Sequence, residues 1–262
     1  MEEPLLSEQG GTTQREYDRV IARVFELLRK NNPDTDRLPF TKADIVRAIN
    51  ELGLVINNVP DIAYTYRTGR SSLPASILAH GNWAIDGAGK GKYVFVHLLR
   101  SLYVDIPSDV EITRILDSTP QILLKYQSKD EQAVLARVRY NRLIDTFTSL
   151  TTYHLQGHFR TTVRGVGQVE VDDLYIGIDA DGSGFILPVE AKSASPKDRL
   201  GVVQITQMVK FAQQNFIDLT VRPIGIKILS DGSYLFMEFD TSTESNLIAT
   251  KRYKRYELYR EI

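Results

Sequence analysis

Apolar residues recur at helical spacing in two segments near the start of the chain. Over residues 15–30 they fall on one stripe, which predicts an amphipathic helix. A second helix is predicted to follow Thr41, because Asp44 stands three residues later in a capping-box position, and to end at Gly53. Residues 57–74 are rich in turn formers, so we expect a loop there and then a short third helix over residues 73–79.

A β-hairpin is predicted after these helices. Residues 83–85 and 93–96 are mostly β-branched or aromatic, and turn formers lie between them. Three helices followed by a two-stranded wing are typical of a winged helix-turn-helix, a module that usually binds duplex DNA. We therefore expect DNA contacts from Arg67 and Arg70 in the loop and from Lys90 and Lys92 at the wing turn. The alternative is a helical bundle whose hairpin only packs against the neighbouring part of the protein and does not contact DNA.

The second half of the chain alternates between strand and helix patterns. Residues 101–125 contain two prolines and look like a connection, and a helical stripe follows over residues 131–150. The remaining predicted elements are strands over residues 168–179 and 184–192, a helix over 203–216, and strands over 222–229 and 234–240. One more strand could lie before residue 163, where the pattern is ambiguous.

This order of elements predicts an α+β fold, within the broad α/β class, with a mixed central sheet flanked by helices. We expect a winged-helix-like DNA-binding domain over residues 1–100, a linker over 101–125 and a sheet-containing domain over 126–262.

Composition excludes several kinds of protein. The chain has no cysteine, which rules out disulfides, thiol nucleophiles and cysteine-ligated zinc or iron–sulfur sites. It has no apolar run near the roughly 20 residues that span a bilayer, and its first residues are acidic where a signal peptide would be basic. We expect a cytoplasmic protein, from a prokaryotic cell, with no membrane contact. The net charge of −1 means that any nucleic-acid binding must come from local basic patches.

Charged residues interrupt two predicted strands in a way that indicates chemistry. Glu190 and Lys192 end an apolar strand and, two residues apart, point to the same face. If this strand pairs with the preceding one about a turn at residues 181–182, an acid near Asp172 comes within reach of Glu190. Two carboxylates and an ammonium on one face can hold Mg²⁺ and orient a water against a phosphodiester. The alternative is a strand end that has emerged into solvent.

This arrangement resembles the PD-(D/E)xK nuclease superfamily, and the residues around Asp172 and Glu190 look like those of its type II restriction endonucleases. The resemblance covers about residues 130–240 and implies a restriction-endonuclease-like core. It implies that Asp172 is the metal-binding acid, with Asp173 as the competing choice, and that Glu190 and Lys192 form the Glu-x-Lys motif. Val171 stands where the family often has proline.

The resemblance extends to the neighbouring helices. Gln204 matches a glutamine often found on the helix after the motif, and Gln207 lies one turn away. A family glutamate on the preceding helix would fall on Glu131, although nothing in the sequence fixes it. Glu170 shares the face of Asp172, so it could join a second metal ion or only line the sheet.

Together these residues predict a Mg²⁺-dependent endonuclease of type II restriction kind, acting on double-stranded DNA, with a homodimer as an open alternative. Asp172, Glu190 and the carbonyl of Ala191 would hold Mg²⁺, for which Mn²⁺ can substitute, and Lys192 would hold or deprotonate the attacking water. Three arginines of the predicted 131–150 helix are expected to contact DNA, namely Arg137, Arg139 and Arg142. The alternatives are a winged-helix regulator with an inactive nuclease fold and a repair or junction-resolving nuclease.

Overall fold

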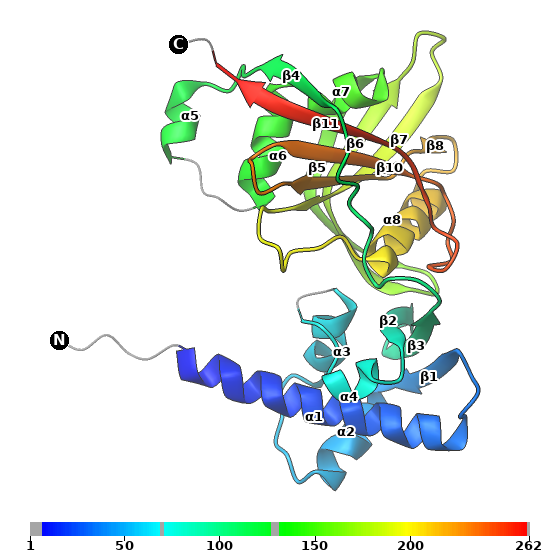
Figure 1. The fold of residues 1–262 in the computed structure, drawn as a ribbon. Coiled ribbons are helices and arrows are strands. Elements are labelled where there is room, and N and C mark those ends of the chain that lie inside the picture. The colour runs from blue at the N-terminus through cyan, green and yellow to red at the C-terminus, as the bar shows by residue number, and fades with distance from the viewer. Residues whose placement is uncertain (1–6, 69–70, 127–130, 261–262) are drawn as a thin grey trace, which may run out of the picture. The chain divides into compact units, whose positions relative to one another are not determined.

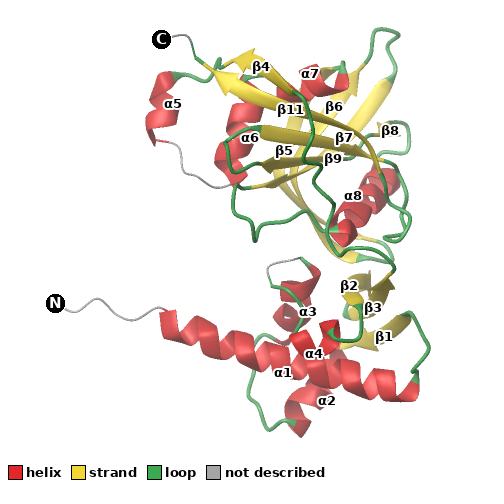
Figure 2. Cartoon of the chain, viewed as in Figure 1, coloured by secondary structure: helices red, strands yellow, loops and turns green. Residues whose placement is uncertain are grey.

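The computed structural model describes residues 7–68, 71–126 and 131–260. This part of the chain is mixed α and β, with helices and two separate sheets, so the α+β class is confirmed (Figures 1 and 2). The chain divides into two units, each with its own sheet. The first ends at Leu102 and includes the short segment Arg164–Gly167, and the second comprises Tyr103–Val163 and Gln168–Ile262.

The first unit combines helices with a small antiparallel sheet of strand order β1-β3-β2. Its elements are α1 (Ser7–Asn31), β1 (Arg37–Thr41), α2 (Lys42–Glu51), α3 (Val59–Arg67), α4 (Ala75–Leu78), β2 (Asn82–Gly89) and β3 (Lys92–Leu98). The two predicted N-terminal helices are confirmed as α1 and α2. At the start of α2 the Asp44 carboxylate accepts a hydrogen bond from the Thr41 backbone N–H at 2.8 Å, as the capping pattern predicted.

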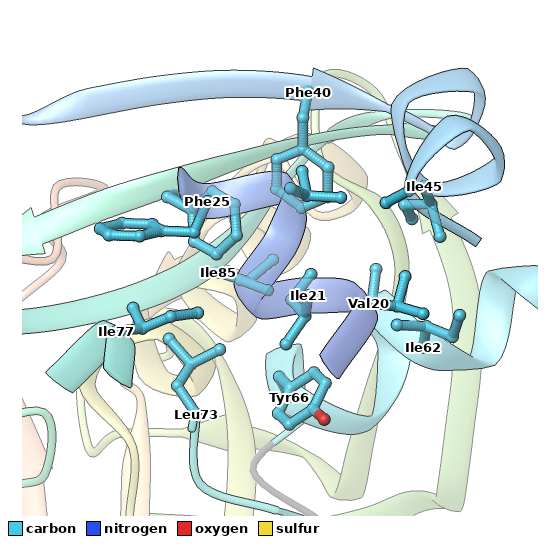
Figure 3. Close-up of a cluster of buried hydrophobic side chains, with 14 of the residues drawn as sticks. Val20, Ile21, Phe25, Phe40, Ile45, Ile62, Tyr66, Leu73, Ile77 and Ile85 are labelled. Atoms are coloured by element: carbon cyan, nitrogen blue, oxygen red, sulfur yellow. The ribbon is translucent and has the colours of Figure 1, made fainter. Parts of the chain in front are cut away.

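One apolar core joins the helices of the first unit to its sheet (Figure 3). The predicted stripe of α1 supplies Ile21 and Phe25, which are fully buried. The ring of Phe25 meets that of Phe95 on β3 edge to face, with centroids 5.2 Å apart. Ile45 of α2 and Ile62 of α3 complete the same cluster. The apolar residues that recur at helical spacing in the sequence are therefore those that α1 buries in this core.

The expected loop over residues 57–74 is partly wrong, because α3 occupies Val59–Arg67. The turn formers that suggested a loop include Pro60, which lies in the first turn of α3. A proline is tolerated there, since the first backbone N–H groups of a helix have no intrahelical acceptor. The short helix expected near residues 73–79 is α4, and the expected hairpin is β2–β3.

The second unit is built on an eight-stranded sheet among the described residues. Its strands are β4 (Ile112–Leu116), β5 (Thr151–Val163), β6 (Gly167–Ile178), β7 (Gly184–Lys192), β8 (Thr220–Val221), β9 (Ile224–Ile228), β10 (Tyr234–Phe239) and β11 (Thr250–Tyr259). Its helices are α5 (Gln121–Tyr126), α6 (Glu131–Tyr140), α7 (Leu143–Thr148) and α8 (Val202–Asn215). The strand order is β4-β11-β10-β9-β7-β6-β5, with β8 beside β7.

The two faces of this sheet are covered by different helices (Figure 2). Apolar side chains of α6 and α7 pack against the face that carries Tyr175, Leu187 and Val189. Helix α8 connects β7 to β9, which run parallel, and it packs against β7. The predicted strands and the helix between them are thus confirmed, and the ambiguous segment before residue 163 is strand β5.

Two expectations for this unit are corrected. The helix expected over residues 131–150 is broken at Arg142, which has a left-handed backbone with φ of 47°, so α6 and α7 are separate. Just before the break, the Asn141 side chain bonds to the Arg137 carbonyl and to Thr119. The segment 101–125, expected as a connection, contains β4 and α5, and β4 pairs in parallel with β11.

Candidate active site

The candidate site lies where strand β6 stops pairing with β7. The β6–β7 ladder runs from Ile178↔Gly184 to Asp173↔Val189, and β7 then continues to Lys192 beside β9. Continuing the register by one pair sets Asp172 opposite Glu190, so the two side chains share a face of the sheet. Here the Asp172 Oδ2 atom accepts a hydrogen bond from the Ala191 backbone N–H at 2.8 Å.

Glu190 and Lys192 form a buried ion pair at this end of β7. Their exposed fractions are 6% and 7%, and the Lys192 Nζ atom donates to Glu190 Oε1 at 2.7 Å. Burying two charges is costly unless they are paired and hydrogen-bonded. The alternative that this strand end has simply emerged into solvent is therefore wrong for these two side chains.

Gln204 reaches the same carboxylate from the first turn of α8. Its Nε2 atom donates to Glu190 Oε1 at 3.0 Å, while its Oε1 atom accepts from the Gly201 backbone N–H at 3.2 Å. The second bond is a helix-capping contact, which fixes the side chain relative to α8. Gln204, fixed on α8, therefore holds the Glu190 carboxylate of β7 in place.

Asp172 and Asp173 point to opposite faces of the sheet and have different surroundings. Asp173 is 0% exposed and accepts hydrogen bonds from Arg139 (Nη2, 2.8 Å; Nε, 3.0 Å) and from Tyr175 (3.1 Å), and it lies 3.0 Å from His154 Nε2. Asp172 is partly exposed and shares the face of Glu190. Asp173 is thus enclosed by its own donors, whereas Asp172 is the acid beside the Glu-x-Lys residues.

Titration behaviour follows from this enclosure. Burial raises the pKa of the Tyr175 hydroxyl, and the neighbouring Asp173 charge raises it further. Burial by itself lowers the pKa of Arg139, but its bonds to Asp173 outweigh that effect and leave the pKa raised. The raised pKa of Arg139 keeps its guanidinium charged, and the raised pKa of Tyr175 keeps its hydroxyl available as a hydrogen-bond donor.

The donor set fits Mg²⁺. In a strand, the N–H and C=O of one residue point to the same edge, so the Ala191 carbonyl lies on the β6 side together with its N–H. This edge therefore combines carboxylate oxygens of Asp172 and Glu190 with a carbonyl oxygen. Mg²⁺ prefers hard oxygen ligands and is usually bound by one or two carboxylates with several waters. Among the described residues, no group of three His, Cys, Asp or Glu could hold an ion together, so the carbonyl and waters would complete the shell.

Three residues noted near the site have other surroundings. Glu170 accepts a bond from Arg160 on β5 at 2.8 Å, which is the arrangement expected if it only lines the sheet; a role with a second ion stays a prediction. Gln207 is buried in α8. Glu131 is the first residue of α6, and the structure does not describe its side chain.

The predicted DNA contacts of the first unit separate into two groups. Lys90 and Lys92 are exposed at the turn between β2 and β3. Arg67 is only 6% exposed, and its guanidinium contacts the Val166 carbonyl at 3.5 Å. A buried guanidinium in this position faces protein rather than solvent, and a contact between Arg67 and DNA bases stays a prediction. Arg70 lies outside the described residues.

The arginines of α6 and the following turn are engaged with carboxylates of the second unit. Arg137 pairs with Asp117 at 2.9 Å, and Arg139 holds the buried Asp173. Arg142 pairs with Asp145 and is mostly exposed. Arg137 and Arg139 are therefore internal partners of acids, and Arg142 is the most exposed of the three; their contacts with DNA stay a prediction.

Sequence reasoning missed two residues next to Lys192. Asp198 Oδ1 lies 3.8 Å from Lys192 Nζ, and Asp198 Oδ2 accepts the Ser193 backbone N–H at 2.6 Å. Lys227 lies beside Lys192 in the β7–β9 pairing and is buried. The signal for Lys227 was the one that identified Glu190, namely a charged residue within an otherwise apolar strand.

The chain matches no known protein-family model, no curated protein and no solved structure. Among the described residues, no helix is both long enough and apolar enough to cross a membrane. What the site can do follows from its own chemistry.

Proposed function

We propose that the protein is a Mg²⁺-dependent endonuclease of the PD-(D/E)xK type that hydrolyses phosphodiester bonds in double-stranded DNA. The observation that carries this proposal is the convergence of Asp172, Glu190, Lys192 and Gln204 from β6, β7 and α8. Two carboxylates, a carbonyl and an ammonium at one strand edge are the groups that metal-assisted phosphodiester hydrolysis requires.

The order of elements around the site supports the same proposal. Helices α6 and α7 precede the strands β5, β6 and β7; α8 then leads to β9, which is parallel to β7. Apart from the break between α6 and α7 and the two-residue strand β8, this order is a helix, three strands, a crossover helix and a parallel fourth strand, which is the arrangement expected of a restriction-endonuclease-like core. In this arrangement the acidic residues come from the second and third strands.

The first unit supports DNA as the substrate. Its order is α1-β1-α2-α3-α4-β2-β3, with β1 paired to β3. Apart from the one-turn helix α4, this is the arrangement expected of a winged helix-turn-helix. The exposed Lys90 and Lys92 lie at the tip of the wing, where a side chain can reach a phosphate. We assign them to backbone contacts, which position a protein on DNA without selecting sequence.

Each site residue has a separate task in the proposed reaction. Asp172 and the Ala191 carbonyl would hold Mg²⁺ together with Glu190, whose Oε2 we assign to the ion because both Lys192 and Gln204 donate to Oε1. Bound there, the ion would lower the pKa of a water and stabilise negative charge on the phosphate. Lys192 would orient the attacking water as an ammonium donor, or accept the water's proton if it has first released its own to solvent, and Gln204 would keep Glu190 aligned.

The site favours an active enzyme over a regulator with a retired nuclease fold. The Glu190–Lys192 pair buries two charges, and a well-packed apolar pair of similar volume is often as stable or more stable. A fold kept only for its shape has no physical need for such a pair. A repair or junction-resolving nuclease would use the same groups, so it differs in substrate and not in chemistry.

Digestion of plasmid DNA tests the proposal and separates these functions. Purified protein is incubated with supercoiled plasmid, linear plasmid and a branched DNA duplex in Mg²⁺, in Mn²⁺ and in EDTA, beside the variant Glu190→Gln. Discrete fragments formed only with a divalent ion, and absent for Glu190→Gln, support a restriction-type enzyme. A smear or cleavage confined to branched DNA supports the repair or junction-resolving alternative. DNA binding without cleavage under every ion condition contradicts the proposal and supports the regulator.

A further inference from the structure

Lys227 is a buried cation whose ammonium is surrounded by backbone carbonyls of one loop. It lies in β9 among apolar residues and is 5% exposed. Its Nζ atom donates to the carbonyls of Ser193, Ser195 (2.8 Å) and Asp198 (2.6 Å). All three acceptors belong to residues 193–200, the stretch that links β7 to α8 and that we call the 193–200 loop.

The number and placement of these bonds mean that Lys227 sets the shape of the loop. An ammonium has three N–H donors directed away from one compact centre, and here three carbonyls of the loop accept them. Three carbonyls within six consecutive residues can point at one atom only if the chain curls around it. Because a buried ammonium is costly without such bonds, the loop and the side chain stabilise each other.

The same loop begins directly after the candidate active-site lysine. Lys192 and Lys227 are partners in the parallel β7–β9 pairing, so their side chains share a face. Asp198 connects the two: its carbonyl accepts from Lys227, its Oδ2 atom accepts the Ser193 N–H at 2.6 Å, and its Oδ1 atom lies 3.8 Å from Lys192 Nζ. Asp198 thus contacts Lys227 through its backbone carbonyl and Lys192 through its side chain.

The loop also presents a polar, basic surface beside the site. Residues 194–197 are exposed, and Lys197 is among them. The guanidinium of Arg199 lies 4.1 Å from the ring centroid of Tyr103, a contact that holds the far end of the loop. The 193–200 loop is thus fixed at both ends and at its centre, so it presents the same surface to every substrate molecule that binds.

We propose that Lys227 is a positioning residue that holds the 193–200 loop in a preorganised form and, through Asp198, keeps the Lys192 ammonium against Glu190. The catalytic consequence rests on the proposed nuclease function, whereas the effect on the loop does not. A catalytic group must be held close to its productive geometry by neighbours that are themselves fixed. Lys227 supplies that support from a strand adjacent to the one that carries Lys192.

Limited proteolysis measures the effect on the loop without any assumption about function. Trypsin can cleave after Lys197 and after Arg199, and mass spectrometry identifies cuts at these two bonds. We expect Lys227→Met to raise the rate of cleavage there at least about tenfold, because three loop carbonyls lose their donor. The matched control is Lys125→Met, which removes the charge of an exposed lysine in α5 and should leave the rate unchanged.

Hydrogen exchange of the wild-type protein gives a reading that does not depend on a variant folding. The Ser193 N–H is bonded to Asp198, and the Asp198 N–H to the Ser195 carbonyl at 3.1 Å. A loop held by Lys227 exchanges these amides at least about 10²-fold more slowly than an unstructured peptide. Exchange at the unstructured rate overturns the proposal, even if Lys227→Met cannot be purified.

Cleavage kinetics test the link to catalysis. In single-turnover conditions we expect Lys227→Met to cut DNA about 10- to 100-fold more slowly, the range found when an outer-shell partner of a site is lost, with a Kd for DNA within about threefold of wild type. If trypsin cuts the 193–200 loop of Lys227→Met faster but the rate of DNA cleavage is unchanged, the positioning role is overturned. It is also overturned if neither the rate of trypsin cleavage nor the rate of DNA cleavage changes. If the loop opens in the variant but the wild-type protein cleaves no DNA, the nuclease proposal fails while the structural effect of Lys227 stands.

Discussion

Replacing Asp172 and Asp173 separately by alanine should give opposite phenotypes. The two residues are neighbours in β6, but they point to opposite faces of the sheet. Asp172→Ala removes a proposed metal ligand from a partly exposed position. Asp173→Ala removes a fully buried carboxylate around which Arg139, His154 and Tyr175 are arranged. The first should abolish cleavage in a folded protein, and the second should mainly reduce stability.

The difference in stability can be estimated from the partners that each variant leaves behind. Without Asp173, the Arg139 guanidinium, which is 32% exposed, and the buried Tyr175 hydroxyl both lose their acceptor, which together costs about 3–5 kcal/mol. Without Asp172, a backbone N–H at a partly exposed strand edge loses an acceptor, which costs about 1 kcal/mol. For a unit of this size each kcal/mol shifts Tm by about 2–4 °C, so Asp173→Ala should lower Tm by about 6–20 °C.

Urea and thermal unfolding followed by circular dichroism measure this difference, and plasmid cleavage measures activity on the same samples. Asp172→Asn is the matched control, because the amide retains an oxygen acceptor but loses the charge that the ion needs. Suppose instead that Asp173→Ala stays as stable as wild type and cuts no DNA, while Asp172→Ala still cuts. The assignment of faces would then be refuted, and Asp173 would be the catalytic acid.

Three further predictions address other parts of the molecule. The double variant Lys90→Ala, Lys92→Ala should bind all DNA sequences more weakly by a similar factor. Because two phosphate contacts are lost, the slope of log affinity against log salt concentration should fall in magnitude by about 2. Fluorescence anisotropy at several salt concentrations measures this slope. Gln204→Ala should slow cleavage about tenfold or more with little change in Tm, because Glu190 loses the partner that aligns it. Burial by itself raises the pKa of Glu238, but Arg222 and Arg252 hold that pKa below its ordinary value. The contribution of Glu238 to stability is therefore present above about pH 4.5 and is lost as pH falls through the lower folded pKa. Glu238→Gln should flatten the loss of stability below pH 4.5, which unfolding measured in acid titrations checks.

Local sequence patterns predicted the elements that carry their own signals. The stripe of α1, the capping box of α2 and the turn at residues 181–182 depend on residues close together in the chain, and all are present in the structure. The site residues Glu190 and Lys192 were also visible, because ions within an apolar strand stand out. The face of Asp172 follows from the alternation of side chains in β6.

The elements that sequence missed depend on distant partners. Strand β4 is exposed along most of its length and shows no alternation, and it is a strand because it pairs with β11 about 140 residues later. The break between α6 and α7 coincides with Asn141, whose side chain bonds to Asp117 and Thr119 outside the helix. The surroundings of Arg67 and Arg139 could not be predicted for the same reason, since nothing local indicates that an arginine will be enclosed by residues from another segment.

The most direct test of the proposed site is the rate of Mg²⁺-dependent plasmid nicking by Lys192→Ala compared with wild type. One lysine contributes little to the attraction for DNA phosphates, but Lys192, paired with Glu190, is the residue proposed to act on the attacking water. The predicted result is a loss of rate of about 10² or more, with nearly unchanged DNA binding. A Lys192→Ala protein that nicks DNA at close to the wild-type rate would contradict the assignment of this site.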